Sequence, residues 1–502
     1  MNRTLAITLT ATSALLVAGC CWGPNAKNSG SATSGATPAA AEGEASVWPP
    51  MPTPGPAPTF NVPESESFTL ANGIKVTLVT TGAVPLVELQ LNIRSGSASD
   101  PAGKEGLAAV TADMLNEGVE GKDSLAIASE LQRLASDVSL GASLDGSVVR
   151  VNSLEGNLEP TLGLVLEMLS SPTFADDDLK RVIEDRKRSL LSSKDDLPTI
   201  AWRSFRRTLF GAQYMGRPGA GTANSLDAIS RDDVAGWHRD AWSPVNSSLV
   251  VVSRMDAATL KPLLDASFGA WGASENSTTP ELSVAATESK TGVNVYWMDK
   301  PGASQSYIIV GNVAPAFDAA TADQRTLGNH PVGGNFTARI NMNLREDKGY
   351  TYGARSGFTA SKNGGLFAAS SSVRADVTAA SITEILAEIR GALGDKPVSE
   401  DEHGRSVGSL VQAEPGSYER MSSVLGQFAR ADQMDYPEGH LQGRSARIAG
   451  ISREDAQASF AEVVSGDDLV IMVVGDWSEA GPAVEELGLG AIIAVDDEGN
   501  PL

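Results

Sequence analysis

Alternating and continuous apolar segments along the chain predict its strands. Residues 87–93, VELQLNI, alternate apolar and polar positions, which predicts a strand with Val87, Leu89, Leu91 and Ile93 on one face. KVTLVTT at 75–81 predicts the strand before it, and a helical pattern follows at 106–118. The first half of the chain then closes on an apolar strand, LVVVS at 249–253.

The second half of the chain repeats this order. NVYWMDK at 294–300 leads to QSYIIVG at 305–311, a helix-permissive stretch follows, and LVIMVVG at 469–475 closes the half. Val295 lies 219 residues after Val76, and Val470 lies 220 residues after Val250. Two copies of one α+β domain explain these offsets better than one large fold, although two unrelated α+β domains can share such spacing by chance.

The repeat and the composition divide the chain into six segments. Residues 20–60 are rich in Gly, Ala, Ser and Pro, a composition that predicts a tether rather than a packed core. Residues 276–290 are polar and predict a linker between the domains. The segments are a signal peptide at 1–19, the tether at 20–60, domains at 61–275 and 291–480, the linker at 276–290 and a tail at 481–502.

The first twenty residues predict export. A short polar start with Arg3, an apolar run from Leu5 to Val17 and small residues before Cys20 form a signal-peptide pattern. This pattern resembles the lipobox of bacterial lipoproteins, and ordinary secretion is the alternative. The resemblance implies that Cys20 becomes lipidated and anchors the chain in the cell envelope. Because Cys21 and not aspartate follows Cys20, it implies the outer membrane, facing the periplasm.

Charge and cysteine content restrict the possible partners. The 62 acidic and 39 basic side chains leave a net charge of −23, which excludes nucleic acid and favours neutral or basic partners. Cys20 and Cys21 are the only cysteines, so the domains hold no disulfide and no cysteine zinc site. The four histidines, none within a helical turn of another, form no local zinc pair and are typical of surface or capping positions.

Residues 106–118, GLAAVTADMLNEG, resemble a helix that carries a metal in a known family. The order of strand, loop and helix resembles the N-terminal domain of the pitrilysin or insulinase-type metallopeptidases, the inverzincins, which include mitochondrial processing peptidase. Their helix carries HxxEH, with two histidines on zinc and a glutamate that activates water. The resemblance implies two homologous, LuxS-like domains, each a mixed sheet covered by helices.

In this chain the motif's positions are Ala109, Ala112 and Asp113, and the family's third ligand, a glutamate, falls on Leu190. Alanine and leucine bind no metal, and one carboxylate does not make a zinc site. The resemblance therefore implies a degenerate site and no metal in this chain. A noncanonical metal at Asp113 with Glu117 or Glu184 is an alternative, although carboxylates on a charged helix are more typical of a solvated face.

The second half retains its family motif. LGNHPVGGNFTARINMNLREDKGYTYGARSGF, residues 327–358, is similar to the family's glycine turn, helix and LRExxGYxY segment. Gly333 and Gly334 predict a tight turn into a helix at 336–344, and Gly349 predicts the start of a strand with Tyr350 and Tyr352 on one face.

The resemblance gives two residues of this segment a role. It implies that Arg345 and Tyr350 reach the zinc site of a facing domain and stabilise the substrate carbonyl. From the residues alone, an arginine paired with Glu346 or Asp347 and tyrosines in the core are the alternative.

One rival motif occurs at 404–408, where GRSVG matches the GxSxG pattern of serine hydrolases. That pattern requires an apolar strand directly before the serine, whereas the preceding residues are polar and predict a helix start. The segment therefore does not predict a nucleophile.

These observations predict a noncatalytic, envelope-anchored subunit of a pitrilysin-type zinc peptidase complex, inactive alone. The resemblance implies a heterodimer in which a homologous, HxxEH-bearing partner subunit holds the zinc, and this chain supplies Arg345 and Tyr350 for proteolysis of extended peptides. The alternative is a noncatalytic envelope scaffold that captures extended peptides by strand addition.

Overall fold

The computed structural model describes residues 60–273 and 290–502. The predicted signal peptide, Cys20, all but the last residue of the predicted tether and all but the last residue of the predicted linker lie outside these ranges.

A mixed, six-stranded sheet forms the centre of the first half. Its order is β1-β2-β8-β3-β7-β6, and β2 pairs with β8 in parallel while the other pairs are antiparallel. The strands predicted from sequence are β2, β3 and β8. The six strands are β1 (Ser65–Thr69), β2 (Lys75–Thr80), β3 (Leu86–Ile93), β6 (Asp137–Ala142), β7 (Ser147–Leu154) and β8 (Ser247–Ser253).

The second half repeats this sheet. Its order is β11-β12-β10-β13-β9-β14, so five strands correspond to β6, β7, β3, β8 and β2 in the same sequence of neighbours. The two sheets differ at the sixth strand, because β1 is antiparallel to its neighbour and β14 is parallel. The duplication predicted from sequence is thereby confirmed. The strands are β9 (Asn294–Asp299), β10 (Gln305–Ala314), β11 (Thr351–Ser361), β12 (Gly364–Arg374), β13 (Val470–Gly475) and β14 (Ile492–Ala494).

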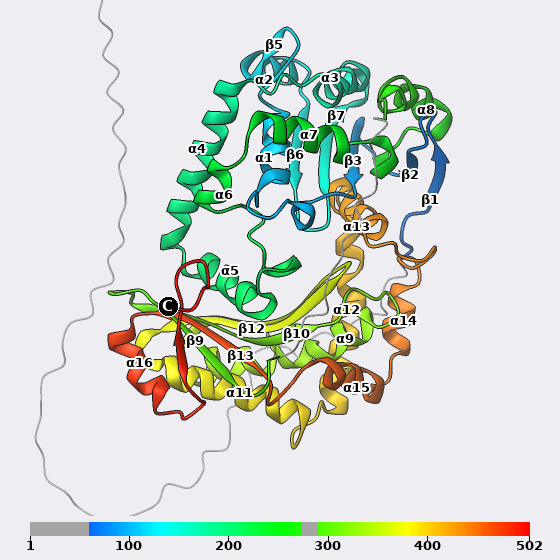
Figure 1. The fold of residues 1–502 in the computed structure, drawn as a ribbon. Helices are drawn as coiled ribbons and strands as arrows, with labels where there is room; N and C mark the ends of the chain where they lie inside the picture. Colours follow the sequence, from blue (N-terminus) through cyan, green and yellow to red (C-terminus); the bar gives the residue numbers. More distant parts are fainter. Residues whose placement is uncertain (1–59, 274–289) are drawn as a thin grey trace, which may run out of the picture. The chain divides into compact units, whose positions relative to one another are not determined.

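Helices of the same half pack on one face of each sheet and form its main core. Figure 1 shows the two halves with their helices. In the first half these helices are α1 (Leu107–Met114), α3 (Leu158–Ser170), α4 (Asp176–Ser192), α6 (Ala223–Asp227), α7 (Arg231–Ala241) and α8 (Ala257–Ala266), with α2 (Ser124–Arg133) beside α3. In the second half they are α10 (Arg339–Asn341), α11 (Thr378–Leu393), α15 (Arg453–Val463) and α16 (Trp477–Glu485), with α9 (Ala322–Asn329), α12 (Glu400–Ala413) and α14 (Arg444–Gly450) beside them.

The opposite face of each sheet is covered by a helix from the other half. Helix α5 (Leu197–Phe210) packs on β10 and β13 of the second sheet, and α13 (Met421–Gln433) packs on β8 and β3 of the first. The two helices begin 224 residues apart, close to the predicted repeat. We call this arrangement the helix exchange.

The helix exchange explains why the closing strands are apolar without interruption. In β8, Leu249 and Val251 face helices of their own half, whereas Val250 and Val252 face α13. The alternate residues of β13 divide in the same way between its own helices and α5. A strand buried on both faces favours apolar residues at successive positions.

The polar face of β3 lies inside the helix exchange. Gln90 and Asn92 are 4% and 3% exposed because α13 covers them. Asn92 Nδ2 donates to the Ala429 carbonyl at 3.2 Å and to Asp432 Oδ2 at 2.7 Å. Gln90 Nε2 donates to Asn92 Oδ1 at 2.6 Å, so these amides are hydrogen-bonded where they are buried.

The segment around the predicted helix 336–344 differs from expectation. Residues 330–334 form a wide π-helical turn, α10 begins at Arg339, and a second π-helical turn spans 342–347. A Cβ on Gly333 would lie 2.2 Å from Ser356 Oγ of β11, so the close approach of that strand requires glycine here. Gly349 has φ +65°, as its predicted turn role requires, but Tyr350 precedes β11 and a bulge follows, so the predicted shared strand face does not form.

The C-terminal residues are part of the second half. Helix α16 packs on its core, and β14 pairs with β9 as the sixth strand of its sheet. The segment at 481–502 is therefore not the separate tail that its position after the last predicted strand suggested, because β14 is too short for its pattern to stand out. Across residues 60–273 and 290–502, no helix has both the length and the apolar character of a membrane span.

The helix exchange predicts that both halves lose stability together. Phe428 on α13 is buried against the first sheet, and Phe205 on α5 is buried against the second. We expect Phe428→Ala or Phe205→Ala to lower the free energy of unfolding by about 3 to 5 kcal/mol. Urea titration followed by tryptophan fluorescence measures this loss, and we expect one transition.

Leu125→Ala on α2 is the control, because Leu125 is exposed, and it should change the free energy by less than about 0.5 kcal/mol. Two separate transitions, or a loss below about 1 kcal/mol for Phe428→Ala, would contradict the structural role of the exchange.

Candidate functional site

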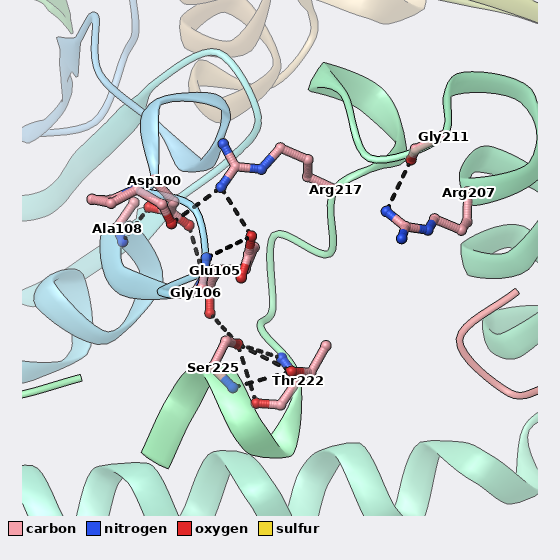
Figure 2. Close-up of polar contacts among 11 residues, drawn as sticks. Asp100, Glu105, Gly106, Ala108, Arg207, Gly211, Arg217, Thr222 and Ser225 are labelled. Atoms are coloured by element: carbon pink, nitrogen blue, oxygen red, sulfur yellow. Dashed lines mark hydrogen bonds and ion pairs between the residues drawn. The ribbon is translucent and has the colours of Figure 1, made fainter. Parts of the chain in front are cut away.

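Helix α1 carries the degenerate motif, and its start is fixed by a buried carboxylate. Gly106 at the N-cap has φ +99°, and Asp100 accepts the Gly106 N–H at 2.7 Å and the Ala108 N–H at 2.8 Å (Figure 2). Burial raises the pKa of Asp100 to about 6, although these N–H donors and the charge of Arg217 act in the opposite direction. The carboxylate thus satisfies helix donors that have no partner within the helix.

An arginine occupies the face of α1 where the family's metal ligands would lie. Arg186 on α4 places Nε 2.7 Å from Asp113 Oδ2, and its Nη2 donates to the Ala109 carbonyl at 2.8 Å. Ala112, between them, is 1% exposed, and Leu190 lies one helical turn after Arg186. The guanidinium therefore bridges the first and last positions of the degenerate motif.

Zinc does not fit this set of residues. Asp113 is ion-paired, Glu117 pairs with Arg181, and Glu184 pairs with Lys187 at 3.1 Å. In the part of the chain that the structure describes, no group of three or more His, Cys, Asp or Glu side chains is placed to hold a metal ion. The alternative of a noncanonical metal at Asp113 therefore has no ligand set within the described residues.

Arg345 and Tyr350 lie away from α1. Arg345 is in the π-helical turn at 342–347, where its Nε is 3.2 Å from Glu346 Oε1 and its Cζ is 4.6 Å from the centre of the Phe336 ring. Tyr350 follows that turn, and its N–H donates to the Leu344 carbonyl. The structure therefore keeps these two residues together but does not bring them to Ala109, Ala112, Asp113 and Leu190.

A cavity of about 1050 Å³ opens beside the degenerate motif. Its wall includes Asp113, Arg186 and Leu190, the loop that joins β6 to β7, the start and middle of α5, the end of β11 and the end of α13. A smaller cavity of about 510 Å³ shares Leu190 and Arg203 with it. Neither Arg345 nor Tyr350 lines either cavity.

The loop at 215–221 forms one wall of the large cavity and is tied to the start of α1. Arg217 Nη2 contacts Glu105 Oε1 at 3.2 Å, and Ser225 Oγ donates to the Glu105 carbonyl at 2.8 Å (Figure 2). Thr222 and Ser225 form a capping box at the start of α6. A Cβ on Gly221 would lie 2.6 Å from the Glu105 carbonyl oxygen, so the loop and the helix start are in close contact.

Three arginines in this wall carry unneutralised charge. Arg203 and Arg206 are on α5 and Arg430 is on α13, and none of them has an ion-pair partner among residues 60–273 and 290–502. Arg206 Cζ lies 5.9 Å from the Trp202 ring centre, and Arg430 Cζ lies 5.9 Å from that of Phe317. Aromatic contacts position a guanidinium without cancelling its charge.

His238 caps a carbonyl in the last turn of α3, as predicted for a capping histidine, whereas His330 differs from the predicted surface or capping role. His238 packs between Phe174 and Trp242, and its Nε2 lies 3.0 Å from the Leu169 carbonyl oxygen. Burial lowers the pKa of His238 to about 4.

His330 is also buried, and its Nδ1 lies 3.0 Å from Ser406 Oγ, the serine of the GRSVG segment. Asn335 Nδ2 also approaches this nitrogen, at 2.9 Å. Ser406 is buried in the middle of α12, without the strand-to-helix turn that exposes a hydrolase nucleophile. The pair therefore serves the packing of α12.

With the fold and this geometry established, family models match both halves. Residues 75–213 match the model described as Insulinase (Peptidase family M16), and residues 228–410 match the model described as Peptidase M16 inactive domain. The chain belongs to the M16 (insulinase) peptidase family, as a member without the HxxEH ligands. The family resemblance drawn from the sequence is confirmed.

Relatives and solved structures agree with this assignment. An uncharacterized zinc protease of Streptomyces coelicolor is 20% identical over 79% of this chain and 86% of its own length. The non-peptidase homolog YmxG of Helicobacter pylori is 24% identical over 30% of this chain and 35% of its own length.

A crystal structure of a peptidase M16 inactive domain from Pseudomonas fluorescens has a TM-score of 0.76 and 23% identity, over 82% of this chain and 98% of that one. A protease from Helicobacter pylori also has a TM-score of 0.76, with 17% identity over 82% and 99%. These likenesses show the fold.

The sequence held signals for two features that motif matching missed. Arg186 lies four residues before Leu190 and therefore shares its helix face. The sequence alone therefore allowed the prediction that a cation takes the place of the metal at this position. Arg203 and Arg206 are three residues apart and therefore share a face of α5, but the sequence does not show that this face borders a cavity.

The ion pair between α1 and α4 is testable by a double-mutant cycle. We expect Arg186→Gln and Asp113→Asn to be coupled by about 1 kcal/mol, because each change leaves the other group without its charged partner. Urea titration of the two single variants and the double variant measures the coupling. Arg188→Gln on the same helix is the control, since Arg188 is exposed and, among the described residues, forms an ion pair with Asp185 alone. Strict additivity of the two changes would contradict the bridging role.

His238 predicts a loss of stability in mild acid. Because its folded pKa of about 4 lies below the ordinary value of 6.5, the unfolded chain binds a proton more readily between these values. The stabilisation is present above pH 6.5 and is lost as pH falls through 4, by roughly 2 to 3 kcal/mol. We expect His238→Gln to flatten the decline of the unfolding free energy over this range, as measured by urea titration. Parallel profiles for the two proteins would show that His238 does not set the decline.

Proposed function

We propose that this chain is a noncatalytic subunit of an M16-type zinc peptidase, paired with a homologous subunit that carries HxxEH. The observation that carries the proposal is the guanidinium of Arg186 on Asp113 and the Ala109 carbonyl, inside an otherwise complete family fold. In such a complex the zinc and its activated water belong to the partner subunit, and this chain completes the peptide-binding chamber.

The surface around Arg345 supports a partner-facing role. The Arg345 side chain is 37% exposed, and it does not line the cavity beside the chain's own degenerate site. Several of the large hydrophobic side chains that are exposed on the described residues fall in the same short segment, namely Phe336, Met342 and Tyr352, the last 91% exposed. Exposed apolar groups beside an arginine are typical of protein interfaces.

In this complex Arg345 and Tyr350 would donate hydrogen bonds to the substrate carbonyl as negative charge develops on its oxygen. A guanidinium and a phenol are both suitable donors, and donors aimed at the developing charge lower the barrier. The guanidinium of Arg345 lies over the Phe336 ring, and its Nε forms an ion pair with Glu346. These contacts leave other N–H groups of the guanidinium available. The lipid on Cys20 would hold the complex at the outer membrane, facing the periplasm.

Peptide hydrolysis tests the proposal. We expect the chain without its first twenty residues to be inactive alone and active only when mixed with the HxxEH-bearing homologue of the same cell. Arg345→Ala and Tyr350→Phe should each lower kcat of the mixture by about 10²-fold, the usual cost of one lost donor. Arg133→Ala, an exposed arginine of α2, is the control and should leave kcat unchanged.

Activity of the chain alone would contradict the noncatalytic assignment. An active mixture that is indifferent to both substitutions would contradict the role of Arg345 and Tyr350 but keep the subunit role.

A noncatalytic peptide-binding scaffold is the second candidate, and the sheet edges favour it. Strand β6 is an edge strand, and its last residue and the turn after it line the large cavity. An edge strand offers unpaired N–H and C=O groups to an extended peptide. This role requires peptide binding by the chain alone and no activity with any homologue.

A further inference from the structure

The large cavity has a charge opposite to that of the whole chain. Five arginines line it, at 186, 203, 206, 217 and 430, against the two carboxylates Asp113 and Asp145. The chain as a whole carries a net charge of −23. A cationic wall in an acidic protein is therefore a local feature, which net charge does not reveal.

Both carboxylates in the wall are already engaged. Asp113 pairs with Arg186, and Asp145 accepts hydrogen bonds from the Tyr214 hydroxyl and the Lys362 N–H. Arg217 pairs with Glu105. The guanidiniums that remain without a charged partner on the described residues are the three on α5 and α13.

The position of the Arg203 side chain is energetically costly, whereas Arg206 is exposed. Arg203 Nε is buried without a hydrogen-bond partner among the described residues, which costs about 1 to 3 kcal/mol for such a group. Arg206 is accessible to water inside the cavity, yet the surrounding protein lowers the pKa of its guanidinium by desolvation. An anionic ligand in the cavity would pair with these arginines and would offset the cost of the buried Arg203 donor.

The rest of the wall suits a peptide. Neutral hydroxyl groups line it beside the edge strand β6 and the end of the edge strand β11, and these suit the N–H and C=O groups of an extended chain. A volume of about 1050 Å³ exceeds the need of a single small anion. The hydroxyls are those of Ser97, Ser143, Ser189, Ser193, Thr199, Thr359 and Ser361.

We propose that this cavity binds an acidic peptide segment, whose carboxylates pair with Arg203, Arg206 and Arg430. The proposal rests on the peptide-binding role proposed above but not on the partner subunit. It also reverses the preference for basic partners that the net charge suggests. Arginine pairs with carboxylates through two parallel hydrogen bonds, so each unpaired guanidinium specifies one acidic side chain or a terminal carboxylate.

Calorimetric titration of the chain without its first twenty residues tests this proposal. The probes are three hexapeptides that alternate alanine with glutamate, glutamine or lysine. We expect the glutamate peptide to bind at least about tenfold more tightly than the glutamine peptide, and the lysine peptide not to bind. Rising salt should lower the affinity for the glutamate peptide but not for the glutamine peptide, because only the former binds through its charges.

Substitutions on two separate elements locate the site. We expect two variants to bind the glutamate peptide about tenfold or more weakly, namely the double variant Arg203→Gln with Arg206→Gln and the single variant Arg430→Gln. The control variant Arg133→Gln on α2 should bind it with unchanged affinity. The melting temperature of the Arg203→Gln variant should equal or exceed that of the unmodified chain, because a buried unpaired donor is removed.

Equal binding of the glutamate and glutamine peptides, or full affinity in both cavity variants, would overturn the proposal. Binding of inorganic phosphate as tight as that of the glutamate peptide would also overturn it, in favour of a site for a free anion. Because these titrations use the chain alone, their failure is distinguishable from an inactive subunit mixture, which bears on the proposed complex.

Discussion

The reciprocal packing of α5 and α13 determines both the architecture of this chain and the position of its cavity. Each sheet is covered on one face by helices of its own half and on the other by a helix that the other half supplies. Because both helices are needed, neither half has a complete core without the other. The large cavity lies beside these helices, so the arginines on α5 and α13 are presented from two elements whose separation the cores fix.

The degenerate site keeps a positive charge where the family holds a metal. Arg186 contacts the carboxylate and the carbonyl at the two ends of the motif, so the interface of α1 and α4 has a cation between them without a metal ligand. Helices α1 and α4 are therefore joined by an ion pair at this position. A metal site lost without a substitute would leave Asp113 without a charged partner beside the α4 helix.

The sequence predicted the features that depend on local pattern. Strand alternation, the offset between the halves and the motifs at 106–118 and 327–358 gave the fold and the family. The burial of Gln90 and Asn92 was not predictable, because it depends on α13, which is more than 300 residues away. The π-helical turns around Arg345 were missed because their apolar spacing still resembles that of an α-helix.

The contacts of Arg186 and of the arginines that line the large cavity were also not predictable from local pattern alone. The spacing of Arg186 and Leu190 places both on one face, but only the packing of α4 on α1 shows that the guanidinium reaches Ala109. Net charge predicted neutral or basic partners, whereas the charge inside the cavity is determined by the five arginines that line it.

The content of zinc in the purified chain, measured by mass spectrometry after dialysis against zinc and then against buffer, tests the central claim most directly. We expect much less than one equivalent of zinc per chain, with no dependence on Asp113. One equivalent per chain that is lost in Asp113→Asn would show that the residue binds metal, and it would contradict the assignment of Arg186 as the cation of this site.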